Sequence, residues 1–92
     1  MVRAVDTFTL RFSVKGMSDT IRFTFHLLRE QKGIRYKVRT DNPEADFDMH
    51  SKLGLHGLHF VFSDPAIMPE WLTADTDLEA KISNAIKFEL HK

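Results

Sequence analysis

The chain contains no cysteine. This excludes disulfide bonds, catalysis by a thiolate and metal sites built on cysteine. No apolar run approaches the ~20 residues that a membrane-spanning helix needs, so we expect no membrane partner. The opening segment MVRAVDTFTL lacks the apolar stretch of a secretory signal, and we therefore expect a cytoplasmic location.

Glycine and proline are scarce, with four and three among the 92 residues. The glycines are scattered singly, so the chain has no Gly-rich phosphate-binding loop. Low-complexity tracts and internal repeats are also absent. Apolar residues make up 42% and charged residues 28% of the chain, which is ordinary for a globular domain. The length predicts a single domain over residues 1–92.

The net charge is zero, but the two signs are unevenly distributed. Residues 1–40 contain nine Lys/Arg and three Asp/Glu, whereas residues 41–92 contain four Lys/Arg and ten Asp/Glu. Such a split between halves of a chain indicates surfaces of opposite charge, which either face each other or face a partner.

Three segments show the strict alternation of strands that have one buried face. They cover residues 7–15, 20–28 and 34–40, and their connections contain Gly16, Asp19 and Gly33. The apolar set is rich in aromatic residues, and we expect these side chains to point inward: Phe8, Leu10, Phe12, Val14, Ile21, Phe23, Phe25, Leu27, Ile34, Tyr36 and Val38. These segments predict an antiparallel meander with one solvated face.

The C-terminal half is more mixed. Residues 42–54 fit a helix that begins at Asn42 and Pro43 and a strand in which Ala45, Phe47 and Met49 point inward about equally well, with a slight preference for the strand. Residues 57–63 predict another strand, and PEWL a single helical turn. Residues 76–91 predict a helix, with Thr76 and Glu79 at the spacing of a capping box.

The fold class predicted is α+β: an antiparallel sheet of four to five strands, arranged as a meander, with the C-terminal helix packed on one face. The inward aromatic side chains need a cover, because leaving them in water would forfeit roughly 1.5–3 kcal/mol each. The only long apolar stripe that can provide it belongs to the C-terminal helix.

Alternation places a set of cations on the opposite face of the sheet. This predicted anion- or partner-binding set comprises Arg11, Lys15, Arg22, His26, Arg35, Lys37 and Arg39. Like charges on neighbouring strands repel one another, so the set needs a counter-charge. Phosphate, an acidic partner protein and the acidic half of this chain all remain candidates.

The function that these features favour is non-catalytic binding, with a protein partner or a homodimer ahead of nucleic acid. Met68 and Trp71, in a proline-rich connection, are possible partner anchors. The alternative interpretation is that both fill the edge of the core.

Nucleic acid is the second hypothesis. The phosphate contacts would be Arg22, Arg35, Lys37 and Arg39, because basic side chains bind the backbone irrespective of base sequence. The aromatic residues have inward parity, whereas RNA-reading sheets display them for base stacking. The face therefore suits binding to the backbone and does not suit base readout.

Catalysis is the weakest hypothesis. His50, His56 and His59, with Asp46 and Asp48, could form an acid/base or metal cluster, but no established ligand spacing is present. His56 and His59 would point to opposite faces of a strand. We therefore predict no catalytic residue, no metal ligand and no cofactor.

Overall fold

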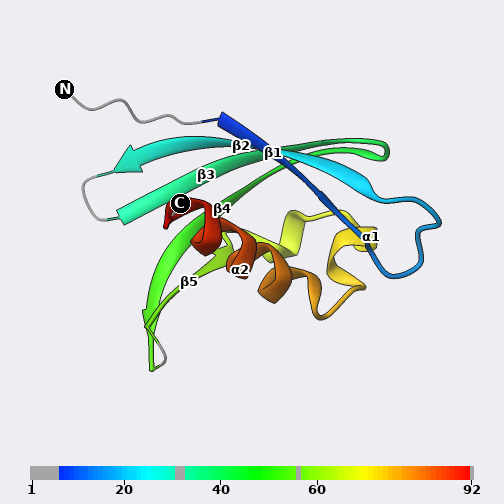
Figure 1. The fold of residues 1–92 in the computed structure, drawn as a ribbon. Helices are drawn as coiled ribbons and strands as arrows, with labels where there is room; N and C mark the ends of the chain where they lie inside the picture. Colours follow the sequence, from blue (N-terminus) through cyan, green and yellow to red (C-terminus); the bar gives the residue numbers. More distant parts are fainter. Residues whose placement is uncertain (1–6, 31–32, 56, 92) are drawn as a thin grey trace.

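The computed structural model describes residues 7–30, 33–55 and 57–91. Five strands follow one another in the chain and lie in the same order in a single antiparallel sheet, and a C-terminal helix packs on it, which confirms the predicted fold class (Figure 1). The strands are β1 (Thr7–Phe12), β2 (Ile21–Glu30), β3 (Gly33–Asp41), β4 (Glu44–Gly54) and β5 (Gly57–Phe62).

The segment that the sequence left open, residues 42–54, is a strand. In β4, Ala45, Phe47 and Met49 are buried, and the acidic residues between them point to solvent. Burial of this apolar set against the sheet outweighs the poor strand propensity of aspartate. The prediction for residues 7–15 was too long, because β1 ends at Phe12.

Three helical segments follow the sheet: η1 (Pro65–Ile67), α1 (Glu70–Thr73) and α2 (Leu78–Leu90). The helical turn expected at PEWL is α1. The capping box expected at Thr76 and Glu79 is wrong. The residue before α2 is Asp77, whose N–H donates to the Asp75 carboxylate at 3.1 Å, and Glu79 instead accepts a hydrogen bond from the β5 main chain.

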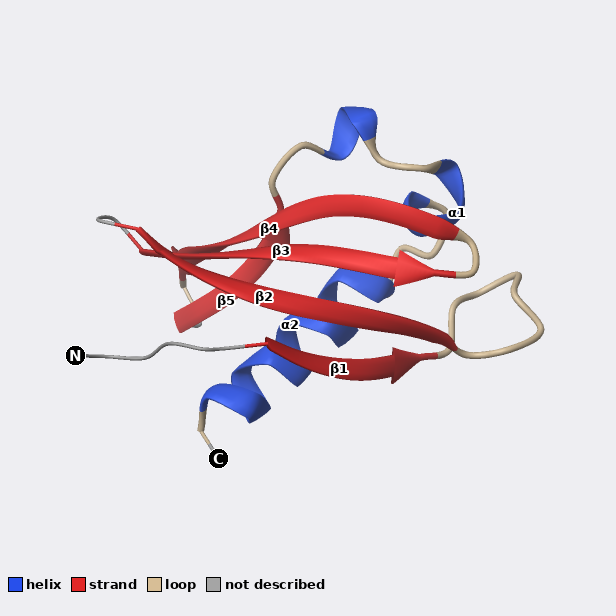
Figure 2. Cartoon of the chain, turned by 90° about the horizontal axis from the view of Figure 1, so that it is seen from above, coloured by secondary structure: helices blue, strands red, loops and turns tan. Residues whose placement is uncertain are grey.

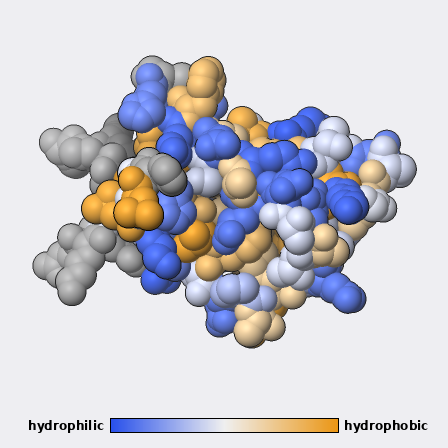
Figure 3. Space-filling view, turned by 90° about the horizontal axis from the view of Figure 1, so that it is seen from below, coloured by the Kyte–Doolittle hydropathy of each residue, from blue (hydrophilic) through white to orange (hydrophobic). Residues whose placement is uncertain are grey.

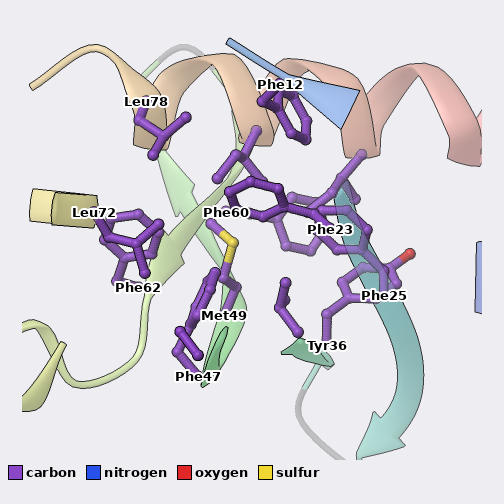
Figure 4. Close-up of a cluster of buried hydrophobic side chains, with 14 of the residues drawn as sticks. Phe12, Phe23, Phe25, Tyr36, Phe47, Met49, Phe60, Phe62, Leu72 and Leu78 are labelled. Atoms are coloured by element: carbon purple, nitrogen blue, oxygen red, sulfur yellow. The ribbon is translucent and has the colours of Figure 1, made fainter. Parts of the chain in front are cut away.

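The core lies between the concave face of the curled sheet and α2 (Figure 4). Phe23, Phe25 and Phe60 are almost completely buried among aromatic neighbours, and Leu78 faces them from the helix. On α2, Leu78, Ile82 and Ile86 are fully buried. This stripe of positions four apart is the side of the helix that faces the sheet, as the helical period predicts.

Side chains of the α2 region also bind the main chain at both edges of the sheet. On the β5 side, Ser83 Oγ accepts a hydrogen bond from Phe60 N at 2.9 Å, and Glu79 Oε2 accepts one from Phe62 N at 2.8 Å. On the β1 side, Lys81 Nζ donates to the Ser13 main-chain oxygen at 2.8 Å. The helix therefore bridges the two edges, and this explains why it lies diagonally beneath the strands in Figure 2.

Among the described residues, no helix combines the length and apolarity needed to cross a bilayer. Seen from below, hydrophilic and apolar side chains are interspersed in small groups over the described surface (Figure 3). Among the residues whose exposure is described, the large apolar side chains exposed to solvent are Leu28, Leu53, Leu55, Ile67, Phe88 and Leu90.

Candidate functional site: the outer face of the sheet

The face of the sheet opposite α2, called here the outer face, carries six of the seven predicted cations. Arg11 lies on β1, two on β2 and three on β3, and their strand neighbours on either side point into the core: Arg11, Arg22, His26, Arg35, Lys37 and Arg39. Lys15 lies in the turn after β1, outside the sheet, and its N–H donates to Asp75 Oδ2 at 2.9 Å.

Three of these cations form ion pairs with aspartates of the chain's own acidic half. Arg22 Nη2 lies 2.9 Å from Asp41, Arg35 Nη1 lies 3.3 Å from Asp48, and Arg39 Nε lies 3.1 Å from Asp46. Two of the acids are on β4, where the register places Asp46 opposite Arg39 and Asp48 opposite Lys37. The sequence left three candidate sources of counter-charge: phosphate, an acidic partner and the chain's own acidic half. For Arg22, Arg35 and Arg39, the counter-charge comes from the chain's own acidic half.

The ion pairs shift the titration of two of their members. The hydrogen bond from Arg22 lowers the pKa of Asp41, and the hydrogen bond to Asp46 raises the pKa of Arg39. The side chains of Arg22, Asp41, Arg39 and Asp46 are about half exposed, from 49% to 64%. Solvent screens such pairs strongly, so they order the side chains more than they stabilise the fold.

The outer face is consequently striped. The basic row on β3 comprises Arg35, Lys37 and Arg39, and the acidic row on β4 comprises Glu44, Asp46 and Asp48. The two rows lie on neighbouring strands, about 4.8 Å apart. On the other side of the basic row, β1 and β2 present hydroxyls among Arg11, Arg22 and His26, and Thr9 Oγ1 lies 3.4 Å from Thr24 Oγ1. A duplex backbone would meet the acidic row together with the basic row, which opposes phosphate binding.

A hollow with a volume of about 400 Å³ lies at the β4 side of this face, between the strands and the connection after β5. It joins two sets of residues that the sequence singled out separately, because Arg35 and Lys37 line one wall and Met68 another. Asp64 and Ile67 also line it, and Ile67 is 78% exposed. We name this site the mixed hollow, since its walls are basic, acidic and apolar.

The two predicted anchors differ in their surroundings. Met68 is partly buried against the core and also borders the mixed hollow. Trp71 is partly buried against the core and does not line the mixed hollow, and this fits the alternative interpretation that it fills the core edge. The exposed apolar residue of this connection is Ile67, which the sequence analysis did not select.

The structure describes two of the three histidines that the catalytic hypothesis would group together, His50 and His59. His50 Nδ1 lies 2.9 Å from Ser63 Oγ, and His59 faces Lys52 across β4 and β5. His56 lies outside the described residues. Within the described part of the chain, no group of three His, Asp or Glu side chains could hold a metal ion.

The acidic row is the feature that sequence reasoning missed. Its signal was present in the alternation of Asp46 and Asp48 with Phe47 and Met49. The alternation identifies an acidic row only once β4 is known to pair with β3, because this pairing places Asp46 opposite Arg39 and Asp48 opposite Lys37.

Comparison of the chain with protein-family models, with curated proteins and with solved structures found no match.

Proposed function

We propose that this domain is a non-catalytic protein-binding module, and that the partner docks a chain segment into the mixed hollow. The segment would place an apolar side chain against Ile67 and Met68 and charged side chains of both signs against the strand walls. The observation that carries this proposal is the convergence of Arg35, Lys37, Met68 and the exposed Ile67 on one hollow.

The charges of the hollow favour a protein segment over nucleic acid. Asp46, Asp48 and Asp64 stand against Arg35 and Lys37 on its walls, so the lining has a small negative excess. A polyanion gains little from such a surface. A peptide of alternating charge can match it, and complementarity of this kind governs partner choice and association rate.

An apolar anchor at the centre of a charged rim is the usual anatomy of a protein interface. Ile67 provides such an anchor, because it is exposed although its neighbour Met68 packs on the core. Burying an isoleucine side chain contributes roughly 1.5–3 kcal/mol. A millimolar complex needs about 4 kcal/mol, so the charged contacts of the hollow must supply the rest of the affinity.

The proposal can be tested with a library of random peptides displayed on phage and selected on the purified chain. We expect enrichment of peptides in which one apolar residue lies between charged residues. Ile67→Asp should weaken binding of a selected peptide roughly tenfold or more, because it removes the anchor and adds a fourth acid to the hollow. Leu53→Asp is the matched control, since Leu53 is 79% exposed on the β4–β5 hairpin and does not line the hollow.

Equal binding of selected peptides to the wild type and to the Ile67→Asp variant would refute the hollow as the docking site. The nucleic-acid alternative is examined separately by electrophoretic shift with random DNA and RNA at two salt concentrations. A shift at low salt that Arg22→Gln, Arg35→Gln or Lys37→Gln weakens would replace the proposed function with phosphate-backbone binding.

A further inference from the structure

Side chains of the α2 region form hydrogen bonds with the main chain of the β5 edge strand, whereas at the β1 edge, within the described part of the chain, they bond only to residues beyond the end of the strand. At the β5 edge, Ser83 and Glu79 occupy the N–H groups of Phe60 and Phe62. Beyond the end of β1, Lys81 occupies the Ser13 oxygen and Asp75 the Lys15 N–H. For Thr7, Thr9 and Arg11, no main-chain partner outside the β1–β2 ladder is found among the described residues. These three residues form the open β1 edge.

The direction of these main-chain groups follows from hydrogen-bond alternation. Successive residues of an antiparallel strand bond to opposite sides. The N–H groups of Phe60 and Phe62 bond to α2 and therefore point away from β4. Applying the same alternation through the registers of β4, β3 and β2 shows that Phe8 and Leu10 are the β1 residues whose main-chain groups bond to β2. The odd residues of β1 therefore direct their N–H and C=O groups outward. The outward bonds of Ser13 and Lys15 continue this parity independently.

The open β1 edge has few of the devices that block edge-to-edge pairing, and Arg11 is the one charged residue of its strand. Its sequence, TFTLRF, has no proline, glycine or lysine and consists largely of residues that favour strands. Phe8 and Leu10 are only partly buried against the core. Figure 2 shows β1 at one margin of the sheet, with the C-terminal end of α2 extending past it. Near that end, Phe88 is 68% and Leu90 39% exposed.

We propose that a second copy of this chain pairs its β1 with this edge, antiparallel and about a two-fold axis at Thr9. Outward groups require odd residues to face odd residues, and a two-fold axis then sets Thr9 opposite Thr9 and Thr7 opposite Arg11. About six main-chain hydrogen bonds form, and two five-stranded sheets become one. A register centred one residue later would need the Ser13 oxygen, which Lys81 already occupies.

Side-chain chemistry agrees with this register. Phe8 of each copy lies beside Leu10 of the other on the core side, so both lose exposed apolar surface. On the outer face, each Arg11 lies beside a threonine, and the two arginines are at opposite ends of the pairing. The chain carries no net charge, so two copies do not repel each other at long range. The overhanging end of α2 brings its exposed apolar residues toward the partner's β1.

This pairing uses a different surface from the mixed hollow and does not depend on it. The hollow lies on the β4 side of the sheet, and β1 is at the opposite end of the strand order. The Ile67→Asp variant should therefore dimerise like the wild type, so failure of one proposal is distinguishable from failure of the other.

The test is sedimentation of the full chain over a concentration series, with the two variants Thr9→Lys and Thr9→Glu. The wild type should show a reversible monomer–dimer equilibrium. Each variant alone should have a dissociation constant raised roughly tenfold, because like charges face each other at the axis. An equimolar mixture of the two variants should recover dimers, since lysine then faces glutamate. Thr20→Lys and Thr20→Glu, at an exposed loop position, should dimerise like the wild type.

Thr9→Pro provides a second variant that separates pairing from folding. Proline is tolerated on an edge strand where its missing N–H would face solvent. The Thr9→Pro chain should therefore keep its circular dichroism spectrum and remain monomeric. A wild type that stays monomeric at all concentrations would overturn the proposal. So would dimers that Thr9→Lys and Thr9→Pro leave unchanged, or a mixture that fails to recover dimers.

Discussion

The carboxylate of Asp75 accepts a hydrogen bond at 2.9 Å from the main-chain N–H of Lys15, which lies 60 residues earlier in the chain. Its other oxygen accepts the N–H of Asp77, and Lys81 Nζ lies 3.8 Å away. This buried carboxylate joins the turn after β1 to the segment just before α2. It therefore holds together the sheet and the helix that covers it.

We predict that Asp75→Asn destabilises the fold and flattens its acid dependence. The hydrogen bonds from Lys15 and Asp77 lower the pKa of Asp75 below its ordinary value of 3.8. The folded state thus favours the ionised form, and the stabilisation is present above pH 3.8 and is lost as the pH falls through the lowered pKa. Urea unfolding between pH 2 and pH 6 measures both effects.

The control for this prediction is Asp77→Asn, at an exposed position two residues away. It should retain the acid dependence of the wild type. A wild-type slope in the Asp75→Asn variant would show that other carboxyl groups govern acid unfolding.

We predict that Ser83→Ala costs about 1–3 kcal/mol in the free energy of unfolding, since the buried N–H of Phe60 is left without an acceptor. Alanine is the better helix former, so helix propensity opposes this loss and cannot cause it. Chemical denaturation of Ser83→Ala beside Asn84→Ala, an exposed neighbour on α2, isolates the effect. Equal stability of the two variants would mean that water replaces the serine hydroxyl.

We predict that the double variant Asp46→Asn/Asp48→Asn binds polyanions more strongly than the wild type. The change removes the carboxylates that pair with Arg35 and Arg39, so the basic row loses its counter-charge. Elution from heparin should move to higher salt, and the salt dependence of binding should steepen by up to about two released counterions.

The matched control for the polyanion prediction is Glu70→Gln/Asp77→Asn, which changes the net charge equally at exposed positions away from the sheet. Equal elution of the two double variants would show that net charge governs heparin binding. In that case the stripes on the outer face would have no influence on it.

Much of the fold was predictable because the pattern that specifies it is local. Alternation in residues 7–15, 20–28 and 34–40 predicted three strands and the face to which their side chains point, and the structure has strands at 7–12, 21–30 and 33–41. The α2 stripe of Leu78, Ile82 and Ile86 was readable in the same way. The capping-box prediction was wrong because the Glu79 carboxylate accepts a hydrogen bond from the Phe62 N–H. That partner lies 17 residues away, so no local sequence pattern reveals it.

The candidate sites were less predictable than the strands. The cations were correctly assigned to one face, except Lys15, whose main chain is held by Asp75 in a turn. Their ion pairs depend on the β3–β4 register, which places Asp46 opposite Arg39. The mixed hollow depends on where the chain after β5 folds back, and Ile67 carries no sequence signal that separates it from a core residue.

The sequence by itself determined which side chains share a face, because consecutive residues of a strand must point to opposite sides of the sheet. Only the tertiary structure decided which faces and edges stay available. Strand pairing brought the acidic half of the chain alongside the basic half, and packing of α2 covered the β5 edge while leaving Thr7, Thr9 and Arg11 uncovered among the described residues. The physical reason is range: alternation acts between neighbours, whereas register and edge cover arise from contacts between segments far apart in the chain.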